Sequence, residues 1–190
     1  MPSSDPLAES PSEPPSQPVE KARARAHHEA AEYAHGEDRP LAGYTATMST
    51  YAATAALLIM GGRLAGRKVP ERPAWSDLAL TSIATFRLSR LLAKDPVTSP
   101  LRAPFTRFAG RSGPSELAEE AREGAARHTV GELLTCPFCV SQWIATAFVG
   151  GLVYAPRLTR LTAATFTVVA ASDFLQFART ALEQATGEAE

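Results

Sequence analysis

Apolar runs alternate with charged segments over most of this chain of 190 residues. Four of the runs approach the length of about 20 residues that a helix needs to cross a bilayer. They are residues 44–62, 74–93, 137–155 and 158–178. The pattern predicts an all-α protein, a small multi-pass transmembrane helical bundle with three to four spans.

Residues 137–155 carry the strongest of these signals, because they contain no charged side chain. Pro137 suits the first turn of a helix. Trp143 and Tyr154 are amphipathic aromatic residues of the kind found at the two surfaces of a membrane. A turn of only a few residues leads into residues 158–178, so we expect these two helices to be antiparallel neighbours.

Residues 44–62 carry a weaker signal. They contain no charge, but their first half is rich in Ala, Ser and Thr, which weakens insertion and favours close packing of helices. A buried helix in a soluble bundle is the open alternative for this segment. In residues 74–93, Arg87 and Arg90 lie near one end, where they either reach the headgroups or pair with a carboxylate inside the bundle.

Composition divides the chain into four regions. Residues 1–40 are rich in Pro, Ser, Glu and Ala, and we expect a disordered tail because they have little to bury. A fraying helix over residues 20–33 is the one element expected within this tail. Residues 41–73 hold the first apolar span and a basic connector, residues 74–180 form the helical membrane domain, and residues 181–190 are a polar tail.

A long polar connection, residues 94–131, follows the second apolar run. Prolines exclude a continuous helix in its first part. A helix is expected from Glu116 towards Leu134, with Ser115 as its N-cap. The connection also combines aromatic and basic residues, which favour either an ordinary basic loop or contact with an anionic lipid surface. These residues are Arg102, Phe105, Arg107, Phe108 and Arg111.

The charged residues of the chain indicate which partners it favours and how it is oriented in the membrane. The chain has 19 Lys and Arg against 20 Asp and Glu, so no excess of positive charge favours nucleic acid. With four spans, most of the Lys and Arg outside the helices lie on the side of both tails. Cytoplasmic loops are enriched in these residues, so we expect the N-tail and the C-tail in the cytoplasm. The N-terminus lacks the basic and apolar regions of a signal peptide.

The predicted topology gathers polar residues at one membrane face, where the second helix ends, the third begins and the fourth ends. This intramembrane polar cluster consists of Arg87, Arg90, Gln142 and Asp173. At 1.5 Å per residue, Arg87 and Asp173 lie at similar depth. We therefore predict an ion pair between the second and fourth helices. The alternative is that each side chain reaches the headgroups separately.

The two cysteines, Cys136 and Cys139, lie in a C-P-F-C sequence where a charged segment ends and residues 137–155 begin. A helix N-terminus favours the thiolate form of cysteine. Thioredoxin-like proteins carry a similar motif after a strand, but this chain shows no βαβ pattern. Three interpretations stay open: packing of a tight turn, thiol–disulfide exchange, and metal binding. His128 and Glu132 are the nearest further ligands for zinc, and they make an incomplete set.

Three blocks of sequence carry a resemblance to a known family. They are G-E-L-L-T-C-P-F-C at residues 131–139, F-R-L-S-R-L at residues 86–91 and D-P-V-T-S-P-L-R at residues 95–102. They resemble the signature of an uncharacterised bacterial family of small membrane proteins, domain of unknown function 1360. The resemblance extends over about residues 75–176 and implies a membrane location with no established activity. Some members of the family are associated with spore formation.

These observations predict a multi-pass protein of the cell membrane, most simply a non-enzymatic structural or accessory component. The alternative is a membrane thiol–disulfide or metal-binding protein that uses Cys136 and Cys139. A component of a small transporter, with Arg87 and Asp173 along a polar path, is a third hypothesis and requires oligomers. No cofactor is predicted. The expected partners are the lipid bilayer and either another protein or a second copy of the chain.

Overall fold

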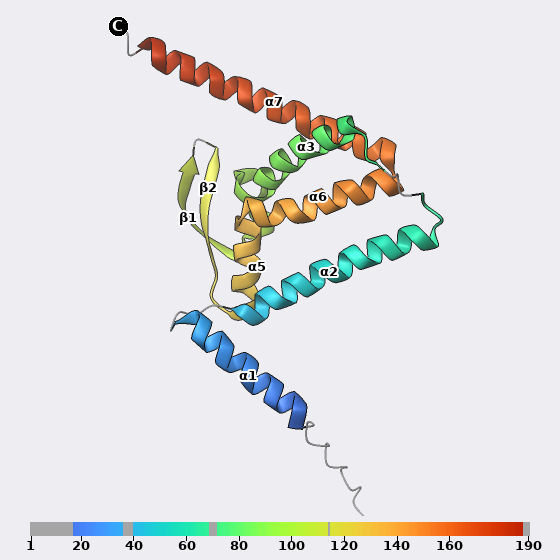
Figure 1. Cartoon of the computed structure of the whole chain (residues 1–190). Helices are drawn as coiled ribbons and strands as arrows, with labels where there is room; N and C mark the ends of the chain where they lie inside the picture. The colour runs from blue at the N-terminus through green and yellow to red at the C-terminus, as the bar shows by residue number, and fades with distance from the viewer. Residues whose placement is uncertain (1–16, 36–39, 69–71, 114, 188–190) are drawn as a thin grey trace, which may run out of the picture. The chain divides into compact units, whose positions relative to one another are not determined.

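The computed structural model describes residues 17–35, 40–68, 72–113 and 115–187. The described chain is mostly helical and contains one β-hairpin (Figure 1). Its elements are α1 (Gln17–Ala34), α2 (Leu41–Leu64), α3 (Trp75–Lys94), the 3-10 turn η1 (Pro96–Thr98), α4 (Ser99–Arg102), β1 (Thr106–Gly113), β2 (Glu116–Ala121), α5 (Ala125–Thr135), α6 (Pro137–Tyr154) and α7 (Pro156–Gly187). Contacts divide the chain into two units, residues 1–41 and residues 42–190.

The first unit contains α1, in the region for which the sequence predicts disorder. Residues 1–16 lie outside the described part of the chain. Residues 17–34 form one continuous helix, which extends the helix expected over residues 20–33. Its side chains are mostly exposed, and Arg25 pairs with Glu29 one turn later, with Nε 3.0 Å from Oε1. Such i, i+4 pairs add modest stability to a solvated helix.

The core of the second unit lies between α3, α6 and α7. α3 and α7 run parallel, since Asp77 pairs with Arg160 near their starts and Arg87 pairs with Asp173 further along. α6 turns back into α7 at Ala155, so it runs antiparallel to both, as predicted for α6 and α7. Small alanines on α3 and α7 let the helices approach closely. The buried apolar side chains are Ala84, Ala93, Val140, Ile144, Phe148 and Ala163.

Side-chain hydrogen bonds attach α2 to α5 and α6. Tyr44 donates to Glu132 on α5, with Oη 2.5 Å from Oε2. Tyr154 of α6 donates to the backbone carbonyl oxygen of Leu58, also at 2.5 Å. Gly61 faces the same tyrosine, and a Cβ atom at this position would lie 3.0 Å from Tyr154 Oη. The first predicted apolar helix is therefore present, and it runs beside α6 (Figure 1).

Residues 106–113 and 116–121 form the two strands of an antiparallel β-hairpin, where the sequence predicts a helix from Glu116. The strands are irregular at Gly110, whose φ of +141° is a conformation that glycine adopts readily and other residues do not. The β2 sequence, E-L-A-E-E-A, has the local composition of a helix. Pairing with β1 and a buried ion pair of Glu119 override that preference. The all-α prediction is wrong in this segment, and α5 begins only at Ala125.

Among the described helices, two are long and apolar enough to cross a membrane: α6, residues 137–154, and α7, residues 156–187. The prediction of three to four spans is therefore not supported by length and composition. α3 carries three charged residues between its ends, and Thr, Ser and Gly dilute the apolar character of α2. Core helices of soluble proteins reach a similar length and composition, so the exposure of the apolar side chains becomes important.

Candidate functional site: an ion-pair groove and a cysteine pair

A groove of about 710 Å³ lies between α3, the tip of the hairpin and α7. Five charged residues contribute to its lining: Arg87, Arg90, Asp95, Glu116 and Asp173. Three aromatic rings from α3 and α7 also line it: Phe86, Phe174 and Phe177. The groove thus brings together segments that are far apart in the sequence, and its charged residues form ion pairs with one another.

Arg87 pairs with two carboxylates in this groove. Its Nε lies 2.6 Å from Asp173 Oδ2 on α7, which confirms the ion pair predicted between these helices. The Nε–H is not aligned for a hydrogen bond, so this contact is one of charge. Arg87 Nη2 also donates to Asp95 Oδ2 at 3.0 Å. The Asp95 contact was not predicted, because it depends on how the chain turns back at Pro96 after α3.

Arg90 also lies in the groove, where it forms an ion pair with Glu116 at the tip of the hairpin. Its guanidinium carbon lies 5.9 Å from the centre of the Phe86 ring. Gln142, the remaining member of the predicted cluster, lies elsewhere. Its amide donates to Tyr51 Oη of α2 at 2.7 Å. The predicted cluster is therefore divided between the groove and the contact of α2 with α6.

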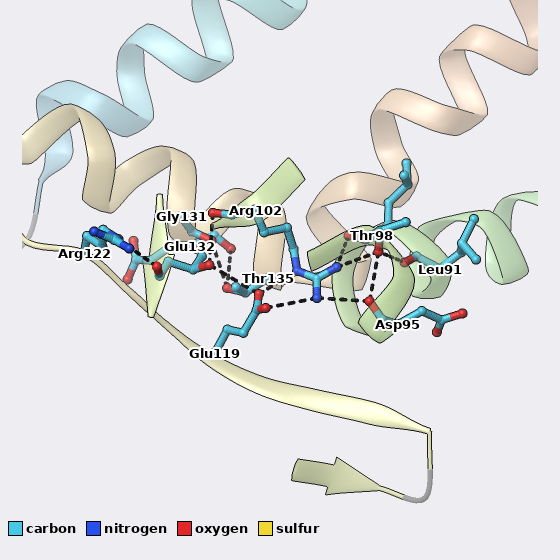
Figure 2. A network of polar contacts seen from close by, with 11 residues as sticks. Leu91, Asp95, Thr98, Arg102, Glu119, Arg122, Gly131, Glu132 and Thr135 are labelled. Atoms are coloured by element: carbon cyan, nitrogen blue, oxygen red, sulfur yellow. Dashed lines mark hydrogen bonds and ion pairs between the residues drawn. The ribbon is translucent and has the colours of Figure 1, made fainter. Parts of the chain in front are cut away.

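Arg102 is almost completely buried, with 1% of its surface exposed. Figure 2 shows its guanidinium group between Glu119 and Thr98, with dashed lines to both. Its Nε and Nη2 donate to the two carboxylate oxygens of Glu119 on β2, at 2.5 and 3.1 Å. Its remaining donors reach Thr98 Oγ1 and the backbone carbonyls of Leu92 and Asp95. A buried charge is tolerated when it is paired and its donors are satisfied. Arg102 therefore joins α3, η1 and the hairpin.

The position of Arg102 corrects the expectation that it belongs to a basic lipid-facing loop. Arg107, Phe108 and Arg111 on β1 are exposed, as that expectation requires, but Arg102 points into the protein. One feature of the sequence distinguishes Arg102 from the exposed basic residues of this segment. Arg102 ends the sequence block 95–102 that resembles the family signature, whereas the other basic residues of the segment lie outside it.

A second interhelical ion pair lies at the other end of α3 and α7. Arg160 Nε and Nη2 donate to the two carboxylate oxygens of Asp77, at 2.8 and 2.7 Å. These hydrogen bonds from Arg160 lower the pKa of Asp77 below its ordinary value, and removal of water by the neighbouring helices opposes the shift in part. This pair was not predicted from the sequence.

The two cysteines lie in contact at the junction of α5 and α6. Cys136 is the N-cap of α6, and its sulfur accepts a hydrogen bond from the backbone N–H of Cys139 at 3.3 Å. The Cys139 Sγ lies 2.8 Å from the Cys136 Sγ and donates to it. Cys136 is half-buried and Cys139 is exposed. The C-P-F-C sequence therefore forms the first turn of a helix, as predicted.

The further metal ligands considered from the sequence are engaged with other partners. Glu132 accepts the hydroxyl proton of Tyr44, and its other carboxylate oxygen lies 3.4 Å from His128 Nε2. Within the described part of the chain, no group of three His, Cys, Asp or Glu side chains is arranged to hold a metal ion.

The fold and these contacts define a mostly helical protein in which ion pairs join the helices to each other and to a hairpin. The chain belongs to the family described as "Protein of unknown function (DUF1360)", whose model matches residues 80–179. This confirms the resemblance seen in the sequence. The matched region contains Arg87, Arg102, both cysteines and Asp173, and it excludes α1 and α2.

A stretch of 71 residues is 35% identical to "Sporulation protein YjcA" of Bacillus subtilis (strain 168). It covers 36% of this chain and 60% of that protein, so the chain matches less than two thirds of its curated relative. No solved structure matches the chain.

Proposed function

We propose that this protein is an integral protein of the bacterial cell membrane and acts as a non-enzymatic structural or accessory component. The observation that carries the proposal is the exposure of α6 and α7. In the most apolar stretch of 18 residues of each helix, only 17% is buried inside the protein for α6 and 6% for α7. A core helix of a soluble protein of this composition buries most of its apolar residues.

Lipid accounts for this exposure. The large apolar side chains that α6 and α7 leave uncovered include Phe138, Val149, Leu158, Leu161, Val168, Phe174 and Leu175. Burial of one such side chain contributes about 1.5–3 kcal/mol. An apolar surface built from many of them is not stable in water without a covering. A bilayer covers the exposed apolar side chains of both helices.

The charges of α3 and α7 fit this arrangement, because charged groups at membrane depth need partners. Arg87 forms ion pairs with Asp95 and Asp173. This pairing allows α3 to lie beside α6 and α7 in the membrane as a third helix. The Asp77–Arg160 pair lies near the α6–α7 turn, at the membrane boundary and outside the spanning segments. The ion-pair groove then lies towards the opposite boundary, next to the hairpin.

The hairpin and α5 supply the non-membrane part of the proposed component. They follow α3 and precede α6, so they lie on the same side as the N-terminus of α6. When α2 is counted as a fourth span, both tails also lie on this side, and the resulting excess of Lys and Arg favours the cytoplasm. The expected partners are the bilayer and either another membrane protein or a second copy. Since the relative's name refers to sporulation, spore formation is the cellular process in which we propose to look for a role.

Fractionation of the full-length chain tests this proposal. We expect it to remain in the membrane pellet after extraction with alkaline carbonate, and to be released by detergent. Val168→Glu places a charge on the exposed apolar surface of α7 and should reduce insertion, whereas Glu183→Gln near the polar end of that helix should not. Recovery of the wild-type chain in the soluble fraction, as a folded monomer, would show that the proposal is wrong.

A further inference from the structure

We propose that Cys136 and Cys139 form a redox-active dithiol that exchanges with disulfides, in which Cys136 is the attacking sulfur and Cys139 closes the intramolecular bond. The proposal goes beyond membrane location and does not depend on it. It rests on the contact between the two sulfurs, on their different hydrogen bonding and on the access that both cysteines keep to solvent.

The distance between the sulfurs favours a bond between them. At 2.8 Å the two free sulfurs are in direct contact, so only a small further movement is needed to reach the disulfide bond length of about 2.05 Å. The two residues occupy the N-cap and the third position of α6, so side-chain rotation is enough to close the gap. The chain has no other cysteine, so any intramolecular disulfide must join these two.

The hydrogen bonds distinguish the two sulfurs. Cys136 Sγ accepts from both the backbone N–H and the thiol of Cys139, whereas Cys139 acts as the donor. Hydrogen bonds to a sulfur and the positive end of an 18-residue helix both stabilise negative charge on it. The thiolate is the nucleophile in disulfide exchange, so these contacts assign the attack to Cys136.

Neither cysteine of the pair is enclosed. Cys139 is exposed and Cys136 is half-buried, so part of each residue stays accessible. An incoming disulfide can therefore approach Cys136 as well as Cys139. The substrate class that fits is a disulfide on a peptide or on a small thiol compound.

The reaction balances without another redox partner. The Cys136 thiolate attacks one sulfur of a disulfide R–S–S–R, forms a mixed disulfide and releases the first RS⁻. Cys139 gives up its proton, attacks Cys136 Sγ in the mixed disulfide and releases the second RS⁻. Each thiol of the protein loses one hydrogen, the two leaving groups take up the protons, and the substrate disulfide is reduced to two thiols.

Thiol counting on the full-length chain in detergent tests the dithiol. The reduced protein is equilibrated with mixtures of oxidised and reduced glutathione, quenched with acid, and labelled with a maleimide of high mass. We expect conversion from a doubly labelled to an unlabelled species, with loss of two hydrogen atoms by mass spectrometry. A protein that stays doubly labelled, or that accumulates glutathione on single cysteines, overturns the proposal. This experiment uses the wild-type chain and is independent of variant folding.

The roles of the two sulfurs are tested with Cys139→Ser and Cys136→Ser. In Cys139→Ser, the serine hydroxyl keeps a hydrogen-bond donor beside Cys136. We therefore expect Cys136 in this variant to react with an aromatic disulfide reagent at neutral pH about ten times faster than Cys139 reacts in Cys136→Ser. Ser141→Cys, in a background lacking both native cysteines, serves as a control for a solitary thiol in the next turn of α6. Equal rates for the two single variants, with helical content preserved by circular dichroism, would overturn the assignment of Cys136. Membrane extraction of each variant reports separately on the proposed function.

Discussion

Asp77 near the start of α3 and Arg160 near the start of α7 form an ion pair with two parallel hydrogen bonds, at 2.8 and 2.7 Å. Further along the same two helices, Arg87 pairs with Asp173 with the charges exchanged between helices. If α7 ran in the opposite direction, Asp173 would face Asp77 and Arg160 would face Arg87, so like charges would meet. The two pairs together therefore favour the parallel arrangement of α3 and α7 over the antiparallel one.

The Asp77–Arg160 pair should make stability depend on pH. Arg160 lowers the pKa of Asp77 in the folded protein, so the pair contributes stability above the ordinary aspartate pKa of about 3.9 and loses it as pH falls through the lower folded-state pKa. We expect the difference in unfolding temperature between wild type and Asp77→Asn to be constant above about pH 5 and to shrink below about pH 4. Thermal unfolding in detergent, monitored by circular dichroism, measures this difference in unfolding temperature.

The control for this pH series is Glu183→Gln, which removes one carboxylate from an exposed i, i+4 pair on α7. It should change the unfolding temperature little at any pH, because such pairs are screened by solvent. A difference for Asp77→Asn that grows on acidification would contradict the assigned direction of the pKa shift.

A charge exchange at Arg87 and Asp173 should restore only part of the stability lost by the single variants. We expect Asp173→Arg alone to lower the free energy of unfolding by about 2 kcal/mol, less than for a fully buried pair because 37% of the Asp173 side chain is exposed. Arg87→Asp combined with Asp173→Arg restores the interhelical pair but leaves the new aspartate beside Asp95.

Adding Asp95→Asn to this double variant should recover further stability, because it removes that repulsion. Denaturant unfolding of the single, double and triple variants in detergent measures each step. If the double variant is no more stable than either single one, the Arg87–Asp173 contact does not contribute as an ion pair.

Arg102 should be far more sensitive to substitution than the other arginines nearby. Arg102→Ala leaves Glu119 buried without its partner, which typically costs about 3–5 kcal/mol. Arg107→Ala and Arg111→Ala on exposed positions of β1 should change the free energy of unfolding by no more than about 0.5 kcal/mol. Chemical denaturation of the three variants makes the comparison, and similar values for all of them would exclude the buried network as a main support of the hairpin.

Gly131→Ala should weaken the packing of α5 on the hairpin. A Cβ atom at this position would lie 2.7 Å from the carbonyl oxygen of Phe105 and 2.9 Å from Ala121 Cβ. Backbone must move to make room, at a cost of about 1–3 kcal/mol. Gly187→Ala is the matched control, since a Cβ atom there meets nothing within 4 Å. Unfolding of both variants in denaturant tests the difference, and a stable Gly131→Ala protein would show that the contact is easily relieved.

Much of the helical framework could be predicted from local sequence. Residues 137–155 were predicted as a helix and form α6 over Pro137–Tyr154, because the uninterrupted apolar run and the flanking prolines act within the segment itself. The Arg87–Asp173 pair was predicted as well, since helix direction and the rise per residue are enough to place both residues at similar depth. These predictions needed only short-range regularity and chain order.

Tertiary structure alone decided the hairpin, the burial of Arg102 and the position of Gln142. β2 has the composition of a helix, and only its pairing with β1 and the Arg102–Glu119 contact make it a strand. Arg102 and Arg107 are chemically identical, and their different burial depends on which carboxylates and carbonyls the fold brings within reach. Apolar periodicity is a property of one segment, whereas satisfaction of a buried charge depends on several segments at once. For this reason the sequence determined the helices and the Arg87–Asp173 pair, and the fold determined the hairpin and the burial of Arg102.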